Sequence, residues 1–585
     1  MKDFIKTTLA VLAAMIILSV VSSMMCLGII GSLASLGGSS QPALPKTGVL
    51  TIDLSKTVIA EQSAQSNPLG SVTSGTEVAI TGIWDAVQAI NTAAQDPCVQ
   101  YIFLKTDNSR TGLSHLSELR AALQNFRTTS GKPIVSYIEN PTTGSYYMAS
   151  VADKVYMTSH PGAIVNLGGI SSQMFFLGDL LDRLGINMQL IRHGKYKSAG
   201  EMFIRNSPSP ENREQNQVMV NSLWNSVAQE ITESRSISVD KLNDLIDNLR
   251  LNLPQDFVDA CLVDEILTRE QLQERLATLA LVDDYKDVKS IAFEDYAKAK
   301  IHSGKAHKKI AVVYADGDIV DGTDKKEVAG DRFCAILEKV RKDSTVKAVV
   351  LRVNSPGGAV LAADKIKHEV DLLGKEKPVV ASYGEYAASG GYWISAGADK
   401  IFSDATTLTG SIGVFSIIPD YSKAAKDLAH VGVTSISSNS HGDIYSGMRP
   451  LDKDEYAYML RSVEDVYDRF TAIVAQGRGM EVSEVDRIGQ GRVWAGTDAL
   501  AIGLVDEIGT LEDAIRYAAV CADDPELENW TVKGYPKPLS AMEEMLSMFN
   551  ISVDGNEGAL LQKFSCLTKG AQMQARIPFE IELKY

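Results

Sequence analysis

A duplication constrains the fold of this chain more than any other feature of its sequence. Four stretches of the first half return in the same order in the second half, about 245 residues later. The matching stretches are 90–105 with 337–352, 132–135 with 377–380, 146–154 with 392–400, and 263–266 with 505–508. Four ordered matches at a nearly constant spacing are hard to obtain by chance. We therefore predict two copies of one domain, at residues 46–300 and 301–585.

Within each copy, β-rich runs alternate with helical patterns, which predicts an α/β fold. Continuous runs rich in Val and Ile are typical of buried parallel strands, and the second copy has them at 310–314, 348–353 and 379–382. Helical periodicity at 359–373 lies between the last two runs. This alternation predicts parallel sheets with flanking helices. Residues 211–250 and their counterpart 452–487 are predicted to be long projecting helices.

Residues 1–45 differ from the rest and are predicted to be a membrane anchor with a short linker. Residues 7–40 carry no charged side chain, and 9–30 are almost wholly apolar. About 20 apolar residues are enough to span a bilayer core. Lys2 and Lys6 precede this run, which predicts a cytoplasmic N-terminus with the rest of the chain outside. A cleaved signal peptide is the alternative, but its apolar core is usually shorter and ends at a small-x-small cleavage site.

Composition excludes several classes of function. Apolar residues make up 45% and charged residues 22% of the chain, as in a globular protein with large cores. The net charge of −16 leaves no basic excess to neutralise phosphates, so we predict no nucleic-acid partner. The six cysteines are far apart and form no C-x-x-C pair, so no metal site is expected and most are interpreted as free thiols. No cofactor is predicted.

Three glycine-rich motifs of the second copy are candidates for chemistry. The motif V-N-S-P-G-G follows a strand, and Gly357 and Gly358 allow a sharp turn that presents bare N–H groups to a developing oxyanion. Ser389 in A-S-G-G-Y and Ser411 in T-G-S-I-G-V each lie among glycines. Taken alone, the first motif is equally consistent with an ordinary strand-to-helix turn, and most serines in glycine-rich turns have no catalytic role. Together, a loop of backbone donors followed by two such serines suits covalent acyl transfer.

These motifs, with A-D-K-I-F at 398–402 and G-x-x-A-x-x-x-G-L-V-D-x-I-G at 496–509, resemble the peptidase family of signal peptide peptidase A, or protease IV. The duplication and the N-terminal anchor resemble the long form of that family, so the resemblance covers essentially the whole chain. It implies tandem domains of the Clp protease and crotonase-like fold. It also implies a membrane-bound serine endopeptidase that degrades cleaved signal peptides and other hydrophobic peptides.

The resemblance implies further properties of the assembly and its location. Peptidases of this fold generally form closed rings, and the long form implies a homo-oligomer, specifically a tetramer. The expected location is the bacterial inner (cytoplasmic) membrane, with a single-pass anchor and the catalytic part on the periplasmic side.

The resemblance also assigns the catalytic residues. It implies that Ser411, in T-G-S-I-G, is the nucleophile, while Ser389 is the rival because its A-A-S context resembles the nucleophile of Clp proteases. No histidine lies in a recognisable catalytic context, whereas a lysine can act as a base if its pKa is lowered. The motif G-K-Y-K-S-A in the first copy resembles the family's G-x-Y-K-S-A, which implies Lys197 as the base. Residues 200–203 lack the proline that the family commonly has there.

Each copy lacks the group that the other supplies. When the copies are aligned on their glycines, Asn166 lies opposite Ser411, and Ile444 lies about opposite Lys197. Residues 107–111, opposite the glycine pair of the second copy, contain no glycine. One composite site, with the lysine from the first copy and the serine and oxyanion loop from the second, accounts for this division.

Two other functions compete with a peptidase. A crotonase-type acyl-CoA enzyme shares the fold and the backbone oxyanion donors, but the anchor and the Ser/Lys division argue against it. A non-catalytic membrane scaffold descended from a peptidase is the other alternative, and the presence of both Ser411 and Lys197 argues against that.

Overall fold

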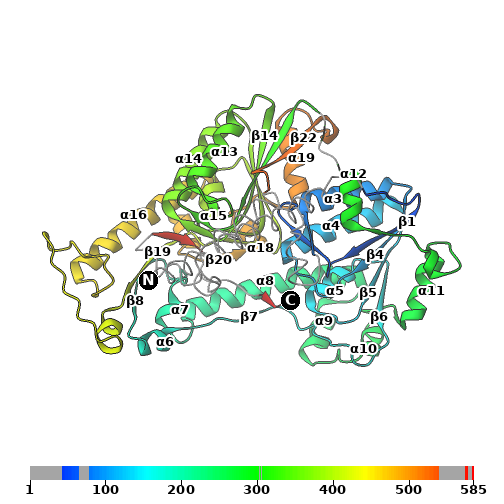
Figure 1. Ribbon diagram of the computed structural model, residues 1–585, viewed down its shortest axis with the longest axis horizontal. Helices are drawn as coiled ribbons and strands as arrows, with labels where there is room; N and C mark the ends of the chain where they lie inside the picture. Colours follow the sequence, from blue (N-terminus) through cyan, green and yellow to red (C-terminus); the bar gives the residue numbers. More distant parts are fainter. Residues whose placement is uncertain are drawn as a thin grey trace, which may run out of the picture.

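The computed structural model describes residues 42–64, 78–301, 304, 306–538, 573–576 and 583–584. The predicted membrane anchor lies outside these residues. In the described part of the chain, no helix combines the length and the apolarity that crossing a bilayer requires. Figure 1 shows two α/β bodies, the first copy in blue to green and the second in green to orange, with the long helix α8 (Pro210–Arg235) running beneath both.

The first copy is built on a parallel sheet of six strands. The strand order is β10-β1-β4-β5-β6-β9, and every neighbouring pair is parallel. The strands are β1 (Gly48–Asp53), β4 (Val99–Lys105), β5 (Ile134–Ile138), β6 (Lys154–Thr158), β9 (Glu265–Leu267) and β10 (Ser290–Ala292). Crossover helices connect them, as parallel pairing requires. They include α3 (Ile83–Gln95), α4 (Leu113–Ser130), α5 (Thr143–Ala149) and α11 (Arg269–Leu279), and α12 (Phe293–Lys300) follows the last strand.

The second copy repeats these six strands in the same order, within a sheet of eight strands. The shared order is β22-β11-β14-β16-β17-β21, with parallel neighbours, which confirms the duplication. Strand β16 also pairs with β18 (Leu408–Gly410), and β18 pairs antiparallel with β20 (Val493–Ala495). The strands are β11 (Lys309–Asp316), β14 (Val346–Ser355), β16 (Val379–Ala388), β17 (Lys400–Ser403), β21 (Glu507–Ile508) and β22 (Thr531–Tyr535). Its helices include α13 (Gly330–Lys342), α14 (Val360–Gly374), α15 (Gly390–Ser395), α18 (Gly496–Ala501) and α19 (Leu511–Cys521). The three predicted strands and the helix predicted at 359–373 are confirmed, whereas the boundaries 46–300 and 301–585 stay predictions.

The two long projecting helices are each shorter than predicted. The first ends at Arg235 because Ser236 adopts a left-handed conformation with φ of 54°, and a separate helix α9 (Val239–Asp247) follows. The second, α16 (Lys453–Arg478), ends at Gly479 with φ of 64°, and α17 (Val482–Ile488) follows it. A left-handed residue is the ordinary end of a helix, and hydrophobic periodicity alone does not reveal it.

A third sheet joins the two copies. Its order is β13-β12-β15-β23-β19-β8, made of β13 (Val328–Ala329), β12 (Ile319–Val320), β15 (Gly357–Ala359), β23 (Gln574–Arg576), β19 (Val414–Asp420) and β8 (Asn187–His193). Only β8 comes from the first copy, and it pairs antiparallel with β19 over the full length of both strands. The copies therefore share a sheet, as well as an apolar core that packs Val312 and Val350 with Leu50 and Leu104.

A buried ionic cluster also lies between the copies. Arg352 of β14 is fully buried, and its guanidinium lies 2.7 Å from the Glu61 carboxylate and 2.5 Å from that of Glu118. His115 lies 3.1 Å from Glu61 and 3.0 Å from Glu385. Burial opposes the charge, but Glu61 and Glu385 raise the pKa of His115 to about 10. The cluster thus links side chains of both copies by paired charges inside the protein.

Candidate active site

The structure brings together three of the predicted site residues, Lys197, Ser389 and Ser411. The Nζ atom of Lys197 lies 3.0 Å from Oγ of Ser411 and 2.9 Å from Oγ of Ser389. It also donates to the backbone oxygen of Ser411 at 3.2 Å. All three side chains are fully buried. The lysine comes from the first copy and both serines come from the second, so the predicted composite arrangement is present as geometry.

The segment after β8 holds Lys197 in place. A guanidinium nitrogen of Arg192, near the end of β8, donates to the backbone oxygen of Lys197 at 2.7 Å and lies 3.0 Å from the carboxylate of Glu201. Although burial opposes ionisation, hydrogen bonds from Ser209 and Arg192 lower the pKa of Glu201. The ion pair of Arg192 and Glu201 therefore fixes the loop that contains Lys197. Because β8 pairs with β19, this loop lies against the second copy.

The surroundings of Lys197 favour its neutral form. Complete burial lowers the pKa of this lysine well below its usual value. Desolvation disfavours an ammonium group when no carboxylate balances it, and burial is the only cause of this shift. A neutral amine within hydrogen-bond distance of a hydroxyl can accept the proton of that hydroxyl. The site is therefore suited to activate a serine without a histidine.

Both serines lie in strained turns. Ser411 has φ of 49° and Ser389 has φ of 54°, values that residues other than glycine rarely adopt. The amide of Ser411 donates to the Arg492 carbonyl at 2.7 Å, and the amide of Ser389 donates to the Gly410 carbonyl at 2.8 Å. Ser389 directly precedes α15. Such strain persists where surrounding structure holds it, and it is frequent at active sites.

The predicted oxyanion loop begins β15, and both of its glycines are required by close contacts. Gly357 has φ of 102°, and a Cβ atom there would lie 2.0 Å from the carbonyl oxygen of Ala575 and 2.7 Å from the amide nitrogen of Gly390. A Cβ atom on Gly358, with φ of 156°, would lie 1.9 Å from the Ile319 carbonyl oxygen. In this structure the Gly357 amide donates to Oγ of Ser355 at 3.2 Å.

Gly491 is a site residue that the sequence reasoning missed. Its φ is 79°, and a Cβ atom there would lie 2.5 Å from Cβ and 2.6 Å from Cα of Lys197. Its amide donates to the carbonyl of Ile412, next to Ser411, at 2.7 Å. Gly491 therefore lets the lysine segment and the serine turn pack against one backbone. The sequence Gly489-Gln490-Gly491 just before β20 (Val493–Ala495) was the available signal.

The structure corrects the alignment of the copies by one residue. Asn166 forms a parallel bridge with Thr142 in the first copy, as Gly410 pairs with Ala388 in the second. Asn166 therefore corresponds to Gly410, and Leu167 lies opposite the serine that follows Gly410. The prediction that Asn166 takes that place is wrong, because the glycine used for the alignment has a glycine neighbour. The conclusion that the first copy lacks this serine is unchanged.

The position of Ser389 also has a counterpart in the first copy. The hydroxyl of Thr143 donates to the Gly169 carbonyl at 2.8 Å, and the hydroxyl of Ser389 donates to the Gly413 carbonyl at 3.4 Å. A hydroxyl at this position therefore exists in both copies, and in the second copy Lys197 donates to it.

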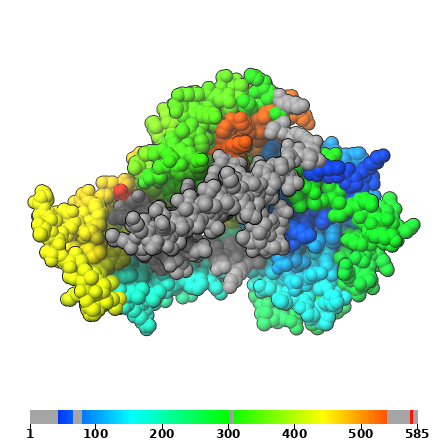
Figure 2. All heavy atoms as spheres, viewed as in Figure 1, coloured from blue at the N-terminus to red at the C-terminus, as the bar shows by residue number. Residues whose placement is uncertain are grey.

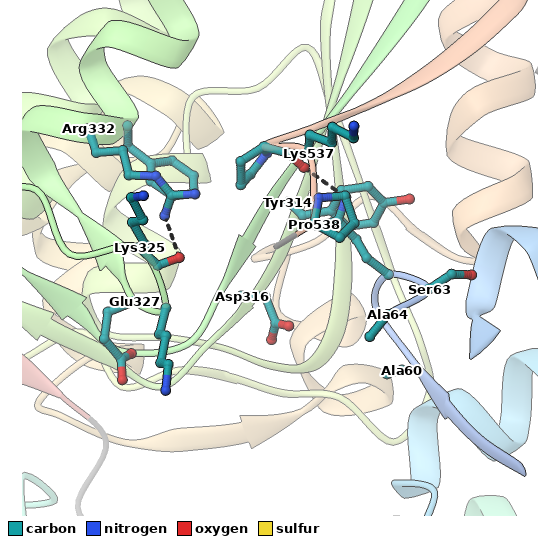
Figure 3. A pocket seen from close by; sticks show the side chains of 14 residues that line it. Ala60, Ser63, Ala64, Tyr314, Asp316, Lys325, Glu327, Arg332, Lys537 and Pro538 are labelled. Atoms are coloured by element: carbon teal, nitrogen blue, oxygen red, sulfur yellow. Dashed lines mark hydrogen bonds between the residues drawn. The ribbon is translucent and has the colours of Figure 1, made fainter. Parts of the chain in front are cut away.

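Other polar clusters of the described residues lie apart from this site. A cavity of about 420 Å³ opens at the C-terminal end of β11, where Tyr314, Asp316 and Arg332 are among the lining side chains (Figure 3). Burial, with Glu61 nearby, raises the pKa of Asp316 to about 6. His441, Asp452 and Glu455 also gather, but Arg449 donates to Glu455 there.

Comparisons with known proteins match segments of both copies. The model of Peptidase family S49 matches residues 127–283 and 371–523, one segment in each copy. Protease 4 of Haemophilus influenzae is 35% identical over 449 residues, which are 74% of this chain and 72% of that protein. Protease 4 of Salmonella typhi is 33% identical over 539 residues, which are 88% of this chain and 85% of that protein.

A chloroplast protein shows the same likeness. The chloroplastic serine protease SPPA of Arabidopsis thaliana is 30% identical over 500 residues, which are 83% of this chain and 72% of that protein. These relatives and the two family matches cover most of the chain and both of its copies. The chain is therefore a serine peptidase that belongs to Peptidase family S49, with two copies of the family's domain.

Proposed function

We propose that this peptidase is a membrane-bound endopeptidase that uses Ser411 and Lys197 as a catalytic dyad to degrade cleaved signal peptides and other hydrophobic peptides. The observation that carries the proposal is the 3.0 Å separation of Lys197 Nζ from Ser411 Oγ inside a fully buried site. A buried neutral lysine next to a serine hydroxyl supplies the base that serine acyl transfer requires.

The chemistry follows in two halves. Neutral Lys197 takes the proton of Ser411 as Oγ attacks the peptide carbonyl carbon, and the resulting ammonium gives that proton to the leaving amine. Water then attacks the acyl-enzyme, with Lys197 again as the base. Backbone amides of the loop at Gly357 and Gly358 stabilise the oxyanion, which requires that the Gly357 amide leave its bond to Ser355.

Ser389 is proposed to line the site and orient the base. The two serines are almost equally distant from Lys197, so distance does not choose between them. The T-G-S-I-G motif favours Ser411. The Ser389 hydroxyl also donates to the Gly413 carbonyl, which leaves its oxygen free to accept from Lys197. A hydroxyl at that position in both copies, Thr143 in the first, also suits a supporting role.

Labelling of the active serine tests the dyad. A fluorophosphonate probe is expected to label the native chain and Ser389→Ala, and to lose its adduct in Ser411→Ala. Peptide mapping of the labelled chain locates the adduct. An adduct on Ser389, with Ser411→Ala still labelled, would reverse the assignment of the nucleophile.

The membrane location is proposed from residues 1–45, because the almost wholly apolar run at 9–30 is long enough to span a bilayer core. The proposal is a retained single-pass anchor in the bacterial inner membrane, with both copies on the periplasmic side. Carbonate extraction of membranes that carry the full chain is expected to leave it in the pellet. Protease added to spheroplasts is expected to reach both copies, and protection of either copy would contradict this orientation.

A closed homo-oligomer, specifically a tetramer, is also proposed. The first copy uses β8 to pair with the second copy, but the corresponding segment of the second copy, after Gly432, forms no described strand. Val433 and Ile436 of this segment are exposed, as is the neighbouring Val431. The segment belongs to the protruding yellow end in Figures 1 and 2. A repeated contact from second copy to first copy of the next chain would cover it and close a ring.

Light scattering tests this assembly. The native chain is expected to have the mass of four chains, and Val433→Asp with Ile436→Asp is expected to lower the mass to that of one chain. The matched control is Val482→Asp, an exposed apolar residue in α17 outside this segment. A native chain that is a fully active monomer would contradict the ring.

A further inference from the structure

A buried amide side chain of α8 holds the segment that carries Lys197. Gln215 is only 1% exposed and belongs to α8, the helix that runs beneath both copies (Figure 1). Its Nε2 atom donates to the carbonyl of Tyr196 at 3.0 Å and to Oγ of Ser198 at 2.9 Å. These two residues flank Lys197 in the sequence. One side chain of α8 therefore holds the backbone just before the lysine and the hydroxyl just after it.

The same side chain also contacts the second copy. Its Oε1 atom accepts a hydrogen bond from the amide of Val493 in β20 at 3.3 Å. Val493 lies opposite Gly410 where β20 pairs with β18, and Gly410 directly precedes Ser411. The carbonyl of Arg492, the residue before Val493, accepts from the Ser411 amide at 2.7 Å. Gln215 thus contacts both the segment of the lysine and the strand that lies beside the serine turn.

A buried polar network in the first turns of α8 fixes these contacts. Oδ1 of Asn212 accepts from Oγ of Ser198 at 3.1 Å and from Nε2 of Gln215 at 3.4 Å. Nδ2 of Asn212 donates to the carboxylate of Glu201 at 3.2 Å, and the amide of Ser209 donates to the same carboxylate at 3.1 Å. All five side chains are buried. Buried hydrogen-bonded networks are rigid, so the amide of Gln215 has one fixed orientation.

A neutral amide is the group that this position requires. A primary amide offers two donors and an acceptor without a charge. A carboxylate in its place would favour the ammonium form of the lysine and weaken it as a base. Two carboxylates near this segment are paired with arginines: Glu201 lies 3.0 Å from Arg192. Glu214, next to Gln215 in α8, lies 3.1 Å from Arg492.

We propose that Gln215 is a positioning residue for catalysis, which holds Lys197 against Ser411 by bridging the two copies through its amide. The inference rests on the proposed function, because it takes Lys197 as the base. A displacement of about 1 Å in a catalytic group costs roughly 10²-fold in rate. Loss of the amide is therefore expected to slow the chemical step. Substrate affinity should not change, because the polar contacts of Gln215 are all with the protein itself.

A substitution that removes the amide tests this role. Gln215→Met keeps a side chain of similar length but has neither the donors nor the acceptor. Its kcat for a quenched apolar peptide is expected to fall by roughly 10²-fold, with KM within about twofold of the native value. Gln217→Met is the control, because Gln217 is an exposed residue of the same helix that donates to Asn221. The assays are run at a temperature at which circular dichroism shows every variant to be folded.

The pH profile gives a readout that a purely structural role would not change. Gln215→Glu keeps the shape of the side chain and places a carboxyl group beside the lysine segment. The midpoint of the curve of kcat against pH is expected to rise by about one unit, because a nearby carboxylate stabilises the ammonium form of Lys197. Gln217→Glu adds the same group on the exposed face of α8 and should leave the midpoint unchanged.

The results distinguish this inference from the proposed function. A Gln215→Met variant with native kcat would overturn the positioning role and leave the dyad intact. A Gln215→Glu variant with the same midpoint as Gln217→Glu would do so too. A Lys197→Met variant that still hydrolyses peptide, or a native chain that forms no fluorophosphonate adduct on Ser411, would overturn the dyad itself.

Discussion

The two copies share one scaffold but differ at the turns that follow β5 in the first copy and β16 in the second. In the first copy, the turn after β5 carries Thr143, with Leu167 beside it; in the second, the turn after β16 carries Ser389, with Ser411 beside it. Six strands follow the same order in the two sheets, and the second sheet adds β18 and β20. The scaffold therefore depends on core residues that both copies keep, while each copy can lose a reactive group that the other supplies.

The counterpart positions at the junction of the copies differ in the same way. Arg352 of β14 is fully buried between two carboxylates, whereas its counterpart Lys105 at the end of β4 is partly exposed and pairs with Asp53 at 2.9 Å. Of these two positions, the one in the second copy forms ion pairs with the other copy, and the one in the first copy pairs within its own copy. Equivalent positions thus form ion pairs that differ in burial, according to which surface of the protein they face.

The largest expected effect is on the dyad. Ser411→Ala and Lys197→Ala are each expected to lower peptide hydrolysis by roughly 10⁴-fold, and the double variant by no more, because groups that act as a unit are not additive. Circular dichroism should show unchanged folding. Thr143→Ala, at the counterpart position of the first copy, should retain full activity. An equal loss of hydrolysis in Thr143→Ala would contradict the proposal that the nucleophile comes from the second copy alone.

The next largest effect is on the junction. Arg352→Met is expected to lower the free energy of unfolding by about 3–5 kcal/mol, because it removes the buried cation that Glu118 pairs with and leaves Glu61 with His115 alone. Lys105→Met, at the counterpart position, is expected to cost less than about 1 kcal/mol because its ion pair is solvated. Urea unfolding of both variants measures the difference. Equal losses would show that the copies do not differ at this position.

Gly491→Ala tests how the rate of hydrolysis depends on the position in which the first copy holds Lys197. The new Cβ atom would collide with the backbone of Lys197, and a displacement of about 1 Å in a catalytic group costs roughly 10²-fold in rate. Gly479→Ala is the control, since Gly479 has φ of 64° with nothing within 4 Å of its Cβ position. The comparison separates backbone strain, which both variants have, from displacement of the base, which only Gly491→Ala should show.

Titration of Lys197 links activity to stability. Activity is expected to rise with pH, up to about tenfold per unit, until the lowered pKa of Lys197 is passed. The unfolded chain holds this proton up to pH about 10.4, so the free energy of unfolding falls as pH falls from there to the folded-state pKa. Lys197→Met is expected to be inactive, more stable at neutral pH and less dependent on pH. Lys195→Met, at an exposed lysine nearby, should change neither property.

The smallest effect is expected where the copies are equivalent. The hydroxyl of Tyr146 donates to the Leu262 carbonyl at 2.5 Å, and that of Tyr392 donates to the Leu504 carbonyl at 2.7 Å. Tyr146→Phe and Tyr392→Phe are each expected to lower the free energy of unfolding by about 1–2 kcal/mol, because each leaves a buried carbonyl without its donor. Similar values would confirm equivalent scaffolds, and a much larger loss in one copy would contradict them.

Much of this protein could be predicted from sequence, because the signals involved are local. Runs of Val and Ile marked β11, β14 and β16, and hydrophobic periodicity marked α14. The repeated stretches showed the duplication, which the common order of six strands in the two sheets confirms. Glycines next to Ser389 and Ser411 marked the turns that the structure strains to positive φ. Apart from the duplication, which comparison of stretches about 245 residues apart revealed, each of these features depends on residues close together in the sequence.

Other features were decided only by tertiary structure. Lys197 reaches Ser411 across 214 residues of sequence, and it does so because β8, a largely polar strand without a strong signal of its own, pairs with β19. The need for Gly491 and the burial of Arg352 arise in the same way, from segments that meet only after both copies pack. The sequence by itself determined which groups were available and which turns could expose them. Packing between the copies decided which groups meet and how far the pKa of the lysine is lowered, because both depend on neighbours remote in sequence and on the exclusion of water.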